Sequence, residues 1–127
     1  MEKMNGEKDR KPRDLKARTK AFALRVIRLY VALPKRAEAQ VIGKQVLRSG
    51  TSVGAHYRES RRARSDAEVV SKLEGGLQEL EETQYWLELL AEAGIVPADL
   101  LAPLLLEAEE LTTILVTCVK RIKARTH

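Results

Sequence analysis

The sequence predicts an all-α protein, an up-and-down four-helix bundle, and three observations support this prediction. Apolar residues recur at intervals of three and four along four long segments, which is the period of a helix with one buried face. Prolines, glycines and a capping box separate these segments, so short loops are expected between them. No segment shows the alternating pattern of a strand. Four antiparallel helices joined by short loops form an up-and-down bundle.

The first two helices are predicted on either side of a proline. From Leu15 onward apolar residues follow helical spacing, with Asp14 placed to cap the helix and Pro34 to end it. A second helix is expected from about Arg36 to about Ser60. The expected buried positions of the two helices are Leu15, Phe22, Val26, Leu29, Leu33, Ile42, Val46, Ser49, Val53 and Tyr57.

Three glycines interrupt the second predicted helix, namely Gly43, Gly50 and Gly54. Each weakens a helix by up to ~1 kcal/mol relative to alanine, so a compensating role is expected. Small residues allow a neighbouring backbone to approach closely. A phosphate-binding loop would need a preceding strand, which is missing here. The glycines therefore predict tight helix packing.

The remaining two helices are predicted from local signals. Ser65 and Glu68 form a capping box that starts the third helix, and Gly94 suits its C-terminal cap. Pro97 is well placed in the first turn of a fourth helix. Its heptad positions are Leu101, Leu104, Ala108, Leu111, Leu115, Cys118 and Ile122. A second stripe on this helix is a candidate for contact with another subunit, namely Leu105, Thr112, Val116 and Val119.

Charge is distributed unevenly along the chain. The 127 residues contain 23 Lys and Arg against 18 Asp and Glu, a net charge of +5. Through Lys72 there are 19 basic and 8 acidic residues, whereas the rest has 4 basic and 10 acidic residues. The basic half could bind a polyanion, or its charge could be neutralised within the fold or by a neighbouring subunit. Residues 1–13 read as a basic flexible tail, and residues 14–127 as the bundle domain.

Several function classes are not expected. Cys118 is the single cysteine, and there is no secretory signal or long uncharged run, so the sequence predicts a reduced, cytoplasmic protein without a membrane segment. Neither His56 nor His127 has a Glu three residues before it, so no metal site is predicted. Cys118 is interpreted as a buried packing residue rather than a nucleophile. We therefore expect no enzyme and no cofactor.

The strongest candidate site is an arginine cluster. Arg58, Arg61, Arg62 and Arg64 occupy the end of the second helix and the loop that follows. Guanidinium groups can bind nucleic-acid phosphates through paired hydrogen bonds, and Lys44 and the basic tail are added to this candidate surface. The alternative is a solvated loop, or pairing with the acidic half of the chain.

The middle of the chain resembles a known family. The residues that carry the resemblance are Arg48-Ser49-Gly50-Thr51-Ser52-Val53-Gly54-Ala55, Glu59, Ser65, Ser71-Lys72-Leu73 and Glu82-Thr83-Gln84-Tyr85-Trp86-Leu87-Glu88-Leu89-Leu90. They are similar to the signature of the bacterial four helix bundle proteins, also called 23S rRNA-intervening sequence proteins. After Ala55 the family usually has Asn, a small apolar pair and Glu. Here only Glu59 of that pattern is kept.

This resemblance implies an architecture more than a chemistry. Family members are left-handed up-and-down bundles that assemble into ring-like homopentamers, with no established catalytic activity. A related set serves retroelements as basic pentameric accessory proteins that bind RNA and a reverse transcriptase. The resemblance therefore implies a homo-oligomer, with RNA or DNA and a nucleic-acid enzyme such as a reverse transcriptase as candidate partners.

Polar residues in the matched region are expected to form a structural network. Arg48 and Glu59 on the second helix could face Glu79, Glu82 or Gln84 on the third. Charge-assisted hydrogen bonds between them would fix the register of the two helices. Two functions remain open, namely a nucleic-acid-binding oligomer that uses the arginine cluster, and a protein-interaction scaffold or accessory subunit whose charge serves assembly.

Overall fold

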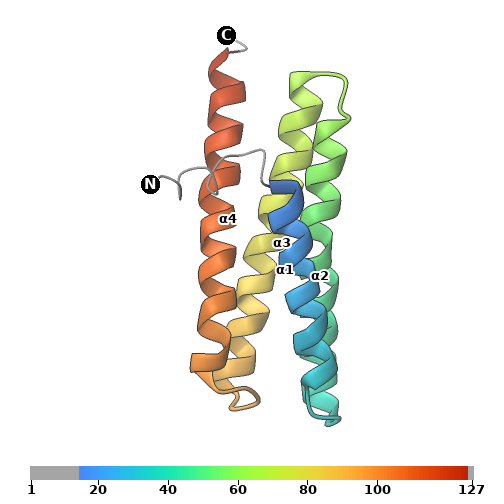
Figure 1. Cartoon of the computed structure of the whole chain (residues 1–127), viewed down its shortest axis with the longest axis vertical. Coiled ribbons are helices and arrows are strands. Elements are labelled where there is room, and N and C mark those ends of the chain that lie inside the picture. Colours follow the sequence, from blue (N-terminus) through green and yellow to red (C-terminus); the bar gives the residue numbers. More distant parts are fainter. Residues whose placement is uncertain (1–14, 126–127) are drawn as a thin grey trace, which may run out of the picture.

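A computed structural model describes residues 15–125, which form four helices that run alternately up and down (Figure 1). The helices are α1 (Leu15–Ala32), α2 (Ala37–Arg61), α3 (Asp66–Glu92) and α4 (Ala98–Arg125). The described residues include no strand. The predicted up-and-down four-helix bundle is therefore confirmed, and each helix begins and ends close to the predicted residues. The predicted tail at residues 1–13 and the capping residue Asp14 lie outside the described residues.

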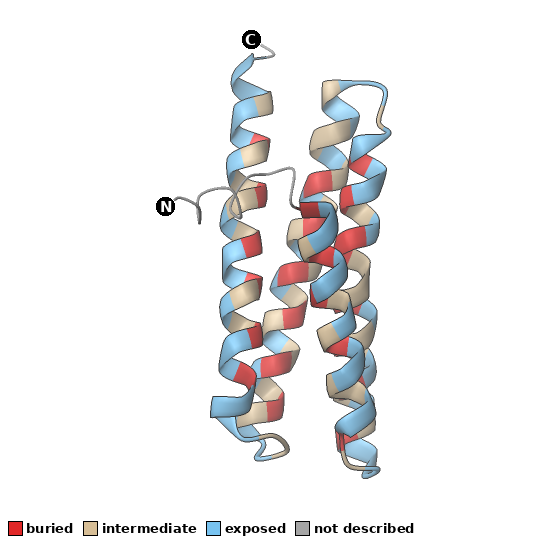
Figure 2. Ribbon diagram, in the orientation of Figure 1, coloured by how far each residue is buried: buried red, intermediate tan, exposed pale blue. Residues whose placement is uncertain are grey.

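The core lies along the facing sides of all four helices (Figure 2). Phe22 on α1, Val53 on α2, Leu87 on α3 and Leu111 on α4 are each fully buried. Burial of this apolar area is the main favourable term in folding. The periodicity in the sequence thus predicted the core-facing side of each helix correctly.

Glycines on α2 bring it close to α1. A β-carbon at Gly50 would lie 2.7 Å from the Val26 side chain, and one at Gly54 would lie 3.1 Å from the Thr19 hydroxyl. Real β-carbons essentially never come as close as the first of these distances. The prediction that these glycines serve tight helix packing is confirmed.

The helix ends follow the predicted caps with two corrections. The Ser65 hydroxyl accepts a hydrogen bond from the Glu68 backbone N–H at 3.1 Å, and Gly94 adopts a φ of 72°. The Glu68 carboxylate, however, accepts from the Arg64 N–H at 2.9 Å and not from Ser65, so the capping box is incomplete. Pro97 precedes α4 instead of lying in its first turn, and its carbonyl accepts from Leu100.

Helix α1 is shorter than the other three helices, so it does not extend to one end of the bundle. It has 18 residues, whereas α3 has 27 and spans about 40 Å. In Figure 1, α1 lies beside the lower part of α2. Among residues 15–125, the upper end therefore consists of the end of α2, the start of α3 and the end of α4.

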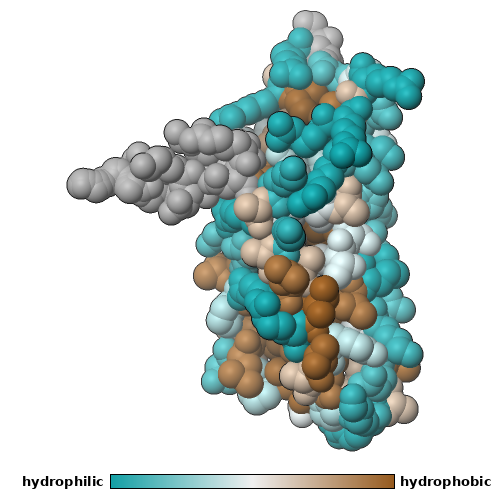
Figure 3. Space-filling view, turned by 45° about the vertical axis from the view of Figure 1, so that its right-hand side comes forward, coloured by the Kyte–Doolittle hydropathy of each residue, from teal (hydrophilic) through white to brown (hydrophobic). Residues whose placement is uncertain are grey.

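One prediction about α4 needs correction. Cys118 is half-buried, and the neighbouring Val119 is buried in its place. Of the second stripe, Val119 belongs to the core and the other members are half-buried, so contact of part of this stripe with another subunit stays a prediction. Large exposed apolar side chains lie mainly elsewhere, and they include Leu24, Ile27 and Val31 on α1. Hydrophobic side chains gather in the lower part of the face shown in Figure 3.

Candidate nucleic-acid interface

The arginine cluster lies at the upper end of the bundle, where α2 ends and the loop to α3 begins. All four side chains are exposed. Arg61 is held in place by Tyr57, since its Nη1 donates to the tyrosine hydroxyl at 3.0 Å. Its guanidinium also lies 5.9 Å from the centre of the tyrosine ring, within cation–π range. Tyr57 itself is buried, so it is a firm support for this arginine.

The four arginines differ from the six ion-paired cations of residues 15–125, although other cations of this range, such as Arg28 and Lys44, also lack a carboxylate partner. Within residues 15–125, none of the four guanidinium groups forms an ion pair with a carboxylate. Six other lysines and arginines in this part of the chain do form ion pairs with carboxylates, and most of these pairs join neighbouring helices. The six residues are Arg18, Arg36, Arg48, Lys72, Lys123 and Arg125. Carboxylates of the acidic half thus neutralise Arg18, Arg48 and Lys123, whereas the arginine cluster has no carboxylate partner among the described residues.

Lys44 does not belong to this cluster. It is exposed on α2, but it precedes Arg58 by 14 residues, which corresponds to about 21 Å along the helix. Lys16, which the sequence did not single out, lies much closer, because it lines the same hollow as Arg58 and Arg61. Only the three-dimensional proximity of α1 and α2 reveals it.

The expected polar network is present in part. Arg48 contacts two carboxylates of α3, with its Nη1 3.2 Å from Glu79 Oε1 and its Nη2 bonded to Glu82. Glu59 lies instead beside Lys72, at 3.4 Å from its Nζ, so it faces a residue two turns nearer the start of α3 than Glu79. The geometry therefore pairs α2 with α3 at two levels.

Gln84 was also expected to face α2, and it does not. Its amide contacts the Thr112 hydroxyl of α4 at 3.4 Å. The polar contact that α2 makes at this level of α3 is a buried one between hydroxyls. Thr83 donates to the Ser49 hydroxyl at 2.8 Å, and Ser49 donates to the Gln45 carbonyl at 2.8 Å. This hydroxyl pair links the two helices without charge.

A bidentate ion pair that the sequence did not predict connects α1 to α4. Arg18 Nε and Nη2 donate to the two oxygens of Glu107 at 3.1 and 2.7 Å, and Nη2 also reaches Glu110 at 3.0 Å. The hydrogen bonds to Glu107 raise the pKa of the Arg18 guanidinium above its ordinary value. The spacing of charges along one helix gives no signal for such a pair, because 89 residues separate its members.

Within the described helices and loops, the groups with nucleophilic or metal-binding chemistry do not assemble into a centre. His56 lies between Glu79 and Glu59, with its ring nitrogens 3.7 and 3.9 Å from their carboxylates. Residues 15–125 contain no cluster of three or more side chains arranged to hold a metal ion. Desolvation raises the pKa of the Cys118 thiol, so at neutral pH it is protonated and a poor nucleophile.

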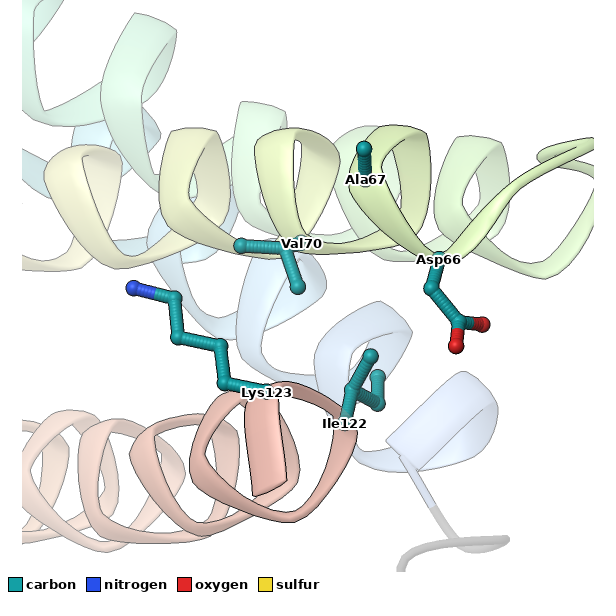
Figure 4. A pocket seen from close by; sticks show the side chains of 5 residues that line it. All are labelled: Asp66, Ala67, Val70, Ile122 and Lys123. Carbon is teal, nitrogen blue, oxygen red and sulfur yellow. The ribbon is translucent and has the colours of Figure 1, made fainter. Parts of the chain in front are cut away.

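A groove between the start of α3 and the end of α4 has a volume of about 340 Å³ (Figure 4). Val70 and Ile122 point into the gap between the helices. The two charged lining residues already have partners, since Asp66 pairs with Arg125 at 3.1 Å and Lys123 with Glu74 at 3.3 Å. Its lining therefore lacks the convergent polar groups that usually define a small-molecule site.

The helix order, the packed core and the exposed arginine cluster define a basic four-helix bundle protein. The chain belongs to the 23S rRNA-intervening sequence protein family, whose model matches residues 13–117. A solved structure from Bacteroides thetaiotaomicron, described as a protein with unknown function from the S23 ribosomal protein family, is similar in sequence and fold. It shares 36% identity with a TM-score of 0.79, and the match covers 84% of this chain and 98% of that one. No curated protein matches the chain.

None of the four described helices is both long and apolar enough to cross a membrane.

Proposed function

We propose that this chain is a non-catalytic, homo-oligomeric four-helix bundle of the cytoplasm that binds structured RNA through the arginine cluster. The observation that supports this proposal is the concentration of four unpaired arginines within seven residues of the described chain. Six cations of the described chain have carboxylate partners, whereas Arg58, Arg61, Arg62 and Arg64 are exposed without one. Unpaired guanidinium groups are the ones that can bind phosphates without first breaking an internal contact.

Assembly would multiply this surface. A ring with rotational symmetry repeats the arginine cluster once per subunit, so weak phosphate contacts add through multivalency. The pentamer follows the resemblance to the four helix bundle proteins. The exposed residues Leu24, Ile27 and Val31 provide apolar area for contacts between subunits.

The test replaces three exposed arginines at the end of α2 and in the loop that follows. In the variant Arg61→Ala, Arg62→Ala, Arg64→Ala we expect at least tenfold weaker binding to structured RNA at ~50 mM salt, since up to three phosphate contacts are lost. Helicity by circular dichroism and mass by light scattering should stay unchanged. The matched control replaces the paired cations Arg48, Lys72 and Arg125 with alanine, which removes the same charge. Equal weakening by both variants would contradict a role specific to the cluster.

A protein-interaction scaffold, or an accessory subunit of a nucleic-acid enzyme, is the second candidate. The exposed apolar stripe on α1 favours it, because such a stripe is a common protein contact surface. A packed helical interface responds much less to salt than phosphate binding does. An assembled protein that retards neither RNA nor DNA at ~50 mM salt would favour the scaffold.

A further inference from the structure

A basic groove follows the outer seam between α1 and α2, next to the arginine cluster. Its upper part has a volume of about 170 Å³ and is lined by Lys16, Tyr57, Arg58, Arg61 and Arg62. Its lower part has a volume of about 270 Å³ and is lined by Thr19, Lys20, Ala23, Thr51, Gly54, Ala55 and Arg58. Because Arg58 lines both parts, they adjoin, and we call the whole the α1–α2 groove.

The α1–α2 groove has a floor of small residues and walls of cations. Gly54, Ala55 and Ala23 have little or no side chain, so the lower part remains open although the two helices are close. Lys16 and Lys20 lie on the α1 side, one turn apart, which separates them by about 6 Å along the axis. Arg58 on α2 and Arg62, the C-cap residue of this helix, are likewise four residues apart. Both walls thus repeat positive charge, and no carboxylate lines either part.

This arrangement suits a ligand with repeating negative charge. A single small anion would need one such pair of cations, whereas a sugar-phosphate strand carries a charge at every nucleotide and can engage successive turns of both helices. Arginine and lysine on opposite walls can contact the same strand from two sides.

The aromatic content of the α1–α2 groove indicates a duplex rather than a single strand. Proteins that bind single strands stack bases on exposed aromatic rings. Tyr57 is the aromatic residue in the lining, and it is only 6% exposed and bonded to Arg61. A groove that offers cations without an accessible ring fits a backbone whose bases are already paired.

We propose that the α1–α2 groove binds one backbone strand of duplex RNA, with Lys16 and Lys20 as binding residues in addition to the arginines. The inference rests on the proposed function and extends it from the end of α2 to a surface formed by two helices. Contacts of this kind read backbone geometry and carry no base sequence.

The test measures the affinity of the full chain for a duplex RNA of about 20 base pairs at ~50 mM salt. The variant Lys16→Ala, Lys20→Ala should bind at least ~10-fold more weakly, with a salt slope reduced by about two units. The matched control, Lys35→Ala, Lys120→Ala, removes the same charge from exposed lysines outside the groove and should weaken binding less than ~3-fold. Equal effects of the two double variants would overturn the proposal that RNA binds in the α1–α2 groove, because the loss of affinity would then depend on the net charge and not on the position of the lysines.

A second variant tests the floor. Ala55→Glu places a carboxylate in the groove and should weaken binding, whereas Ala102→Glu adds the same charge at an exposed position of α4 and should have a smaller effect. Single-stranded RNA of the same length should bind more weakly than the duplex, and equal or tighter binding would overturn the duplex assignment.

The outcomes separate this proposal from the one it rests on. If the wild-type chain does not bind RNA, the proposed function fails. If substitution of Arg61, Arg62 and Arg64 abolishes binding while substitution of Lys16 and Lys20 leaves it unchanged, the proposed function stands and the α1–α2 groove is overturned. Circular dichroism of each variant should match that of the wild type, since the replaced side chains are exposed.

Discussion

Arg18 is the residue through which α1 holds α4, although these two helices otherwise have limited contact. Its side chain and that of Glu107 are each only 19% exposed, so the pair is shielded from solvent more than most surface pairs. We expect Arg18→Ala to lower the free energy of unfolding by about 1–2 kcal/mol in urea denaturation, because Glu107 would be left without its partner. The control Arg28→Ala, at an exposed residue without a described ion pair, should change stability by less than ~0.5 kcal/mol. A loss of unfolding free energy no larger than that of the control would show that the ion pair does not stabilise the fold.

The thiol of Cys118 gives a second prediction at the residue scale, which concerns its reactivity and its effect on stability as pH changes. Its raised pKa means that the folded chain holds the thiol proton at a pH where the unfolded chain has released it. The contribution of this thiol to stability is therefore complete below its ordinary pKa, and it declines as pH rises through the pKa of the folded state. Alkylation by iodoacetamide should be slower in the native protein than in urea, and its increase with pH should be shifted upward. The same rate in both states would contradict this shielding.

The elements of the fold follow closely from local signals in the sequence. Apolar period and caps are properties of neighbouring residues, so the bounds of α2 and α3 could be predicted to within about two residues. The heptad prediction fails at Cys118 for a geometric reason. An ideal helix drifts by about 20° per heptad, so over the 17 residues from Leu101 the buried face turns toward Val119.

The polar contacts between helices could be predicted only in part. Arg48 and its partners lie on adjacent antiparallel helices, where a rough register is enough to bring them together. Glu59 was misplaced because its partner depends on the length of the loop between α2 and α3. The pair of Arg18 and Glu107 depends on how all four helices pack, which no local pattern contains.

The contact of α1 with α2 gives a prediction at the scale of elements. Gly50→Ala would place a β-carbon 2.7 Å from Val26, so we expect a loss of about 1–3 kcal/mol in spite of the higher helix propensity of alanine. Gly76→Ala is the matched control, because its β-carbon would lie 3.6 Å from the nearest side-chain atom of another helix, an ordinary contact. It should be neutral or stabilising by up to ~1 kcal/mol. Thermal denaturation of both variants tests this, and similar effects would contradict close packing at Gly50.

At the scale of the whole molecule, the arginine cluster gives one end of the bundle a concentration of positive charge. Carboxylates of α3 and α4 neutralise several cations along the length of the bundle, whereas the four arginines of the cluster at the upper end lie within seven residues without a carboxylate partner in the described part of the chain. If five subunits form a ring, the arginine cluster is repeated as a ring of positive charge. An assembly of this kind has a mass of about 72 kDa, five times the 14.3 kDa of one chain, which light scattering measures directly.

The salt dependence of RNA affinity tests the central claim most directly. Phosphate binding releases counterions, so the logarithm of the association constant falls linearly with the logarithm of salt concentration, by about one unit for each contact. For the assembled wild-type protein and a structured RNA, titrated between ~50 and ~200 mM salt, we predict a slope of about −3 or steeper, which the Arg61→Ala, Arg62→Ala, Arg64→Ala variant makes shallower. Absence of binding at the lowest salt, or a slope near zero, would contradict nucleic-acid binding by the arginine cluster.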